Sequence, residues 1–93
     1  MLVRNLPSDV DKAKSAFQRR VHARYPDGIG ASALADDLRG KGFHIYNDRK
    51  NGLVIAELEQ HSFPCVFGWS IYWSPDEQGH ARTINGQYRY DCP

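Results

Sequence analysis

Two cysteines and one histidine are the residues of this chain best suited to chemistry. His61 precedes Cys65 by four residues, and Cys92 lies next to the C-terminus. A thiolate beside a histidine can act as a nucleophile, and Cys and His together can bind zinc. However, structural zinc sites take two close ligand pairs, and the chain has no CxxC or cysteine-protease motif. A thiol enzyme or metal-binding module that uses His61, Cys65 and Cys92 is therefore the alternative interpretation of the sequence.

Cys65 begins the segment CVFGWSIYWS (65–74), whose alternation predicts a strand that is buried on one face. Every second residue of this segment is large or apolar, namely Cys65, Phe67, Trp69, Ile71 and Trp73. We expect this set to form the core under the helices, with Trp73 near an edge of the sheet. Cys65 is then an inert buried thiol. A Cys65–Cys92 disulfide is the alternative if the chain is exported.

No cofactor motif is present. The segment GIGAS (28–32) precedes a predicted helix, but it follows another helix and has no Gly-Lys-Ser/Thr sequence. Of the neighbouring carboxylates, only Glu57 and Glu59 share a strand face, and no apolar pocket is predicted beside them that would raise a pKa. We therefore expect no catalytic residues, no cofactor and no metal.

Length and charge limit the class of protein. The 93 residues predict a single domain over 1–93, and 41% hydrophobic with 25% charged residues is typical of a globular protein. Twelve basic and eleven acidic residues give a net charge of +1, so nucleic acid is an unlikely partner. No apolar run is long enough for a signal peptide or a membrane span, which predicts a cytoplasmic protein without membrane contact.

Helical periodicity occupies the first part of the chain. A helix is expected over roughly residues 8–25, with Ser8 as its cap. Its apolar positions fall on one stripe, and they are Val10, Ala13, Phe17, Val21 and Tyr25. The polar residues Gln18 and His22 are placed on the opposite, solvent side. A second helix is expected from Ala31 to Arg39, with Asp36 and Asp37 directed outward.

The pattern then changes to that of strands. Alternating segments predict strands over residues 43–47, 53–59, 65–74 and 80–90, with an Asn51-Gly52 hairpin turn and a bulge near Asn85-Gly86 in the last strand. Short connections make sequential strands antiparallel neighbours. The expected fold is α+β, with two N-terminal helices packed on one face of a four-stranded antiparallel meander (ααββββ).

The segment PDGIGASALADDLRGKGF (26–43) and the strand order resemble small two-helix-plus-meander bacterial modules, such as the outer-membrane assembly lipoprotein family (BamE/SmpA-like). The resemblance implies a similar fold. The lipidated Cys of that family is absent here, and more strands are predicted than that family has. It transfers no functional residues.

Binding to a protein is the main functional prediction. The sheet face away from the helices should be polar, and its candidate contact residues are Ser70, Tyr72, Thr83, Asn85, Gln87 and Arg89. A second candidate surface is the basic part of the first helix, with Arg19, Arg20 and Arg24. The chain would be a small non-enzymatic inhibitor or regulator of a larger protein. Inhibitors of phage and mobile elements, such as anti-CRISPR or immunity proteins, share this small size and lack of motifs.

Overall fold

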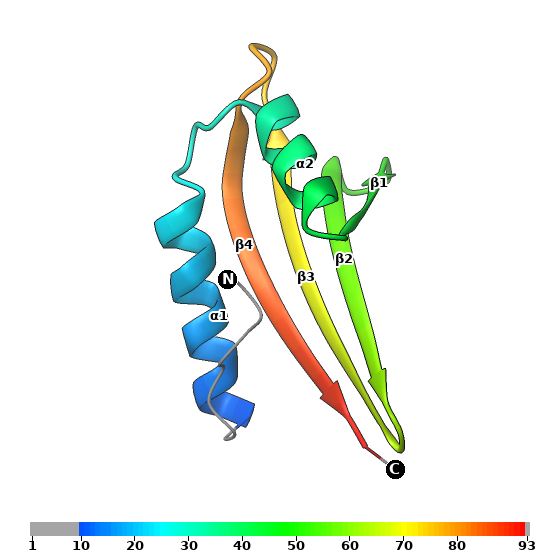
Figure 1. Ribbon diagram of the computed structural model, residues 1–93. Helices are drawn as coiled ribbons and strands as arrows, with labels where there is room; N and C mark the ends of the chain where they lie inside the picture. Colours follow the sequence, from blue (N-terminus) through cyan, green and yellow to red (C-terminus); the bar gives the residue numbers. More distant parts are fainter. Residues whose placement is uncertain (1–9, 93) are drawn as a thin grey trace.

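A computed structural model describes residues 10–92 of the chain. Two helices and four strands follow one another in the order α1 (Val10–Arg24), α2 (Ala31–Gly40), β1 (His44–Asp48), β2 (Leu53–Ser62), β3 (Cys65–Pro75) and β4 (Ala81–Asp91). The strands form one antiparallel sheet in the order β1-β2-β3-β4. The predicted α+β fold is therefore confirmed (Figure 1).

Helix α1 runs alongside β4 and buries the predicted apolar stripe (Figure 1). Phe17 and Val21 are fully buried, and Ala13 and Tyr25 are nearly so. Pro26 follows Tyr25, which is consistent with the end of the helix at Arg24. The predicted cap Ser8 and the side chain of Val10 lie outside the described residues.

Helix α2 is one residue longer than predicted and places Leu34 and Leu38 in the core, both fully buried. The prediction that Asp37 is directed outward is wrong. The Tyr25 hydroxyl donates a hydrogen bond of 2.6 Å to the Asp37 carboxylate, which joins the end of α1 to α2. Lys41, which follows α2 directly, donates a second bond of 3.1 Å to the same carboxylate.

The ends of the strands lie within one residue of their predicted positions, except for the end of β2. Strand β1 begins one residue later, and β2 extends three residues beyond the predicted end at Glu59. Gly52 has a φ of 67°, the left-handed conformation that the Asn-Gly turn predicts. The extension of β2 lengthens the β2–β3 hairpin, whose closing pair is Ser62 and Cys65.

The core is built on β3, as predicted, but Trp73 is not near an edge. Its side chain is only 1% exposed. A bulge in β4 places two residues, Thr83 and Ile84, opposite Trp73, as the register passes from Tyr72–Asn85 to Ser74–Arg82. The bulge turns Ile84 toward the core. Trp73 thus lies opposite the bulge as a fully buried member of the core.

This bulge lies before the predicted position at Asn85-Gly86. Thr83 is its irregular residue, with a φ of 54°. Gly86 has another role, because a Cβ atom there would lie 2.7 Å from Val21 Cγ2 and 3.1 Å from Phe17 Cε2. The glycine lets α1 approach β4 closely.

Two α1 side chains that were predicted to face solvent, the exposed His22 and the partly buried Gln18, also bond to β4. The Gln18 side-chain oxygen accepts a hydrogen bond from the Gly86 backbone N–H. His22 Nε2 donates to the Ile84 carbonyl oxygen at 3.0 Å. These bonds satisfy backbone groups on the outer edge of β4, where no further strand pairs with it among residues 10–92.

Candidate interaction surface

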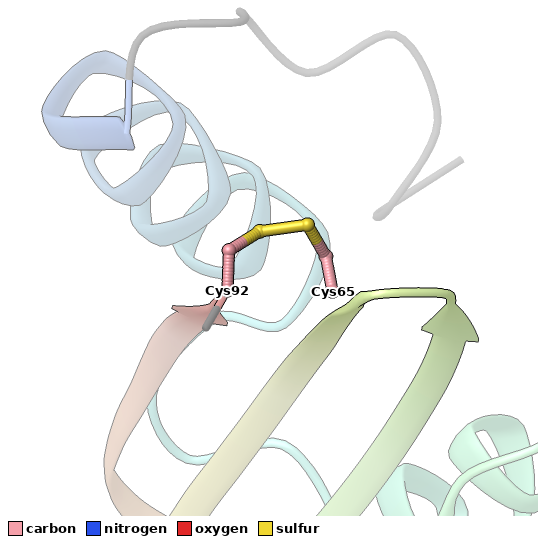
Figure 2. The surroundings of a disulfide bond; sticks show 2 residues. All are labelled: Cys65 and Cys92. Atoms are coloured by element: carbon pink, nitrogen blue, oxygen red, sulfur yellow. A yellow bond between two sulfur atoms is a disulfide. The ribbon is translucent and has the colours of Figure 1, made fainter.

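Cys65 and Cys92 form a disulfide that ties the start of β3 to the end of β4 (Figure 2). The prediction of an inert thiol at Cys65 is therefore wrong, because its sulfur is bonded. The strand register explains the bond: Val66 pairs with Asp91, so the next residues outward on the two strands are Cys65 and Cys92. Neither sulfur is a free thiolate that could attack a substrate or bind a metal.

His61 is the remaining member of the alternative thiol or metal site. It is exposed on β2, and its Nε2 lies 2.7 Å from the Glu59 carboxylate. Among residues 10–92 there is no group of three or more His, Cys, Asp or Glu side chains placed to hold a metal ion. The arrangement of His61 offers an ion pair and no nucleophile.

The outer face, defined as the sheet face turned away from the helices, carries the main candidate surface. Strand pairing aligns its side chains in rows across the sheet. One row runs from Tyr46 through Ile55 and Tyr72 to Asn85. The next row runs through the paired residues His44, Glu57, Ser70 and Gln87.

Five of the six predicted contact residues share this face. Register pairs Ser70 with Gln87 and Tyr72 with Asn85, and places Arg89 opposite Gly68. Gln87 and Arg89 are exposed, while Ser70, Tyr72 and Asn85 are partly buried. The alternation of β3 and of the second half of β4 is regular here, which is why the sequence pattern grouped these residues correctly.

The sixth residue, Thr83, belongs to the bulge and not to these rows. Its backbone N–H donates a hydrogen bond of 2.6 Å to Asp27 in the connection between the helices. Alternation failed at this position because the bulge inserts one residue into the period of two. Asn85 is also held in place, since its side chain accepts from Gln18 at 3.2 Å and donates to the Thr83 carbonyl at 3.1 Å.

The outer face also carries residues of β1 and β2 that were not selected as contact residues from the sequence, among them Tyr46, Ile55 and Glu57. Tyr46 is 44% exposed, and its hydroxyl donates a 2.7 Å hydrogen bond to Glu57. This bond is the main cause of a raised pKa of the Tyr46 phenol. Ile55 lies between Tyr46 and Tyr72 in the same row. The alternation of LVIAELE already separates Leu53, Ile55 and Glu57 from the core set, and this was the available signal.

Arg89 crosses the middle of the outer face. Its guanidinium lies over Gly68, where a Cβ atom would come within 3.3 Å of the Nε and Nη2 atoms. The Nη2 atom is 3.9 Å from a Glu59 carboxylate oxygen on β2. Because Gly68 has no side chain, the arginine can reach across β3 to the opposite strand.

The three arginines of α1 do not all point in the same direction. Adjacent helical residues point about 100° apart, so Arg19 and Arg20 face different directions. Arg19 is exposed and Arg20 is partly buried. Arg24 makes an ion pair of 3.7 Å with Asp37 on α2. This second candidate surface stays a prediction.

Comparison with protein-family models, with curated proteins and with solved structures finds no significant match for the chain. The resemblance to two-helix-plus-meander modules is therefore one of element order. No helix among residues 10–92 has the length and apolar character needed to cross a membrane.

Proposed function

We propose that this chain is a small non-enzymatic domain that binds a larger protein through the outer face of its sheet and regulates that protein. The observation that carries the proposal is the row of Tyr46, Ile55 and Tyr72, which lies on the face that neither helix covers. An aromatic and aliphatic strip surrounded by polar groups is the composition of protein interfaces.

The rows beside this strip supply hydrogen-bonding groups. Gln87 and Arg89 are exposed on β4, and Ser70 lies between them and β2. Tyrosine and arginine contribute disproportionately to binding energy at protein interfaces. Tyr72 and Arg89 are therefore the proposed anchors, and the polar groups around them would set the orientation of the partner.

The charge of β2 indicates the chemistry of the partner. Glu57 and Glu59 project from neighbouring outer-face positions of this strand. Glu59 already lies close to His61 and Arg89, whereas Glu57 accepts a hydrogen bond from the neutral Tyr46 hydroxyl. A partner with an apolar strip opposite Tyr46 and Tyr72 and a basic side chain opposite Glu57 would complement both features. The proposed partner is a folded protein with such a surface.

The cytoplasmic location remains a prediction. The Cys65–Cys92 disulfide weighs against it, because such bonds persist mainly in oxidising compartments. An intact disulfide in the purified native protein, measured by mass spectrometry under alkylating conditions, would place the target protein in an oxidising compartment as well.

The partner can be identified with a photoreactive amino acid incorporated at Tyr72 and, in a second protein, at Tyr46. The control position is Glu77, an exposed residue in the turn between β3 and β4. We expect one and the same protein to be crosslinked from both tyrosine positions and not from Glu77. Crosslinking from Glu77 alone, or of unrelated proteins from the two tyrosine positions, would contradict the proposal.

A further inference from the structure

Half of one edge of β2 is open. This strand spans Leu53–Ser62, but β1 pairs only with residues 53–57. Within residues 10–92, the second half of β2 therefore has a neighbouring strand on one side only, which is β3. Figure 1 shows β1 beside the upper part of β2, with the lower part free on that side.

The backbone groups that face this open edge can be assigned. The bonds from α1 show that Ile84 and Gly86 direct their backbone groups away from β3. In an antiparallel sheet this direction alternates along each strand, and the two residues of a pair direct their backbone groups either both toward one another or both away from one another. Following the register through β3, the groups that point to the open edge of β2 are the N–H and C=O of Glu59 and His61.

We propose that two copies of the chain associate through this edge, with their β2 strands antiparallel around a two-fold axis at Gln60. In this register Glu59 of each copy lies opposite His61 of the second copy, and each such pair can exchange both of its backbone hydrogen bonds. The carboxylate and imidazole of each pair then lie side by side on the outer face. Two sheets become one continuous sheet.

Charge complementarity selects this register over its neighbours. A shift that still pairs outward-facing backbone groups would set Glu59 against Glu59, or His61 against His61. Like charges directly opposite one another are unfavourable. A Glu59–His61 pair can instead form a hydrogen bond or, with a protonated imidazole, an ion pair, and within one chain these two side chains already approach to 2.7 Å.

The same register accounts for an exposed aromatic side chain. Phe63 follows β2 directly in the hairpin turn and is 99% exposed. Glu57 already pairs with His44 at the start of β1. The β2 strand of the second copy can therefore extend along the open edge only as far as the start of β1. The turn that carries Phe63 would thus lie against the start of β1 in the second copy, where its ring loses exposure to water.

The dimer can be tested with a charge exchange, using sedimentation velocity from low micromolar to near millimolar protein. The wild-type chain should move toward twice its 10.6 kDa mass as concentration rises. Glu59→Lys should raise the dimer dissociation constant by about tenfold or more. The double variant Glu59→Lys/His61→Glu should restore dimerisation, because it reverses both members of each pair.

Asp91→Lys is the matched control, since it makes the same charge change at an exposed outer-face position on β4. It should leave the dissociation constant unchanged. Circular dichroism would show that each variant is folded. Hydrogen exchange gives an independent measurement: the amides of Glu59 and His61 should exchange more slowly at high concentration, while the amide of Gln60 is protected at all concentrations.

The proposal does not depend on the larger partner described above. A chain that stays monomeric at all concentrations would overturn it. So would a dimer in which the Glu59 and His61 amides exchange as fast as in the monomer, or in which the double variant is as weak as Glu59→Lys.

Discussion

The guanidinium of Arg89 on β4 reaches across β3 to lie 3.9 Å from the carboxylate of Glu59 on β2. Gly68, directly beneath it, leaves the space for this crossing. Both side chains remain largely exposed, at 69% for Arg89 and 49% for Glu59. The ion pair therefore leaves the guanidinium on the outer face accessible to water and to a partner.

Arg89→Ala should therefore leave the fold almost unchanged. Exposed ion pairs contribute little to stability, so we expect the free energy of unfolding to change by less than about 1 kcal/mol. Urea denaturation followed by tryptophan fluorescence measures this. A small stability effect would make Arg89→Ala a specific probe of partner binding, whereas a loss of several times that size would show a structural role.

Removal of the disulfide should cost far more. Cys65 and Cys92 are separated by 27 residues, and closing a loop of that size stabilises a protein by about 3.5 kcal/mol in the chain-entropy description. The Cys65→Ala/Cys92→Ala variant should lose about this much in urea denaturation. Reductant should lower the stability of the wild-type chain and leave the variant unaffected. If the wild-type chain and the double variant were equally stable without reductant, the presence of the Cys65–Cys92 disulfide would be contradicted.

Gly86 tests the close contact between α1 and β4. A Cβ atom at this position would lie 2.7 Å from Val21 Cγ2, so Gly86→Ala should destabilise the protein by about 1–3 kcal/mol through overpacking. Gly40→Ala is the matched control, because no atom lies within 4 Å of a Cβ there and alanine favours helix. Equal stability of both variants in thermal unfolding would contradict the close approach of Val21 to Gly86.

The bond between Tyr25 and Asp37 should make stability depend on pH. Hydrogen bonds from Tyr25, and then from Lys41, hold the pKa of Asp37 below its usual value of 3.8. A lowered pKa in the folded state stabilises the fold above the ordinary pKa, and this stabilisation is lost as pH falls through the lowered value. Tyr25→Phe removes the main cause, so its stability should fall less between neutral pH and pH values below 3.8.

Tyr46→Phe is the control for this experiment. It removes a tyrosine–carboxylate bond of similar length, 2.7 Å to Glu57, but Tyr46 is 44% exposed whereas Tyr25 is 2% exposed. At neutral pH, Tyr25→Phe should cost about 1–2 kcal/mol and Tyr46→Phe clearly less, because a buried bond to a charged group contributes more. Identical urea curves for the two variants would argue against the role of burial.

The sequence predicted most of this fold because its local signals agree with one another. The stripe of Phe17 and Val21, the Asn51-Gly52 turn and the alternation in β3 each act within a few residues. The pairing of Ser70 with Gln87 and of Tyr72 with Asn85 followed from alternation and strand order alone.

Features that depend on residues far apart in the sequence could not be predicted from such local patterns. Gly86 looked like a bulge site, but its small size serves the approach of Val21 from α1. The bulge lies instead at Thr83, and threonine is not a residue type that indicates a bulge in the sequence. Cysteine spacing left both a thiol and a disulfide open at Cys65, because only the β3–β4 register brings Cys92 beside it.

The most direct test of the outer face as a binding surface is the affinity of the purified, crosslink-identified partner for two variants, measured by calorimetry. Tyr72→Ala removes the proposed central anchor, and Gln78→Ala changes an exposed residue of the β3–β4 turn. We predict that Tyr72→Ala weakens binding by at least about thirtyfold, equivalent to roughly 2 kcal/mol, and that Gln78→Ala leaves the dissociation constant unchanged. Equal affinities for wild type and folded Tyr72→Ala would contradict the account.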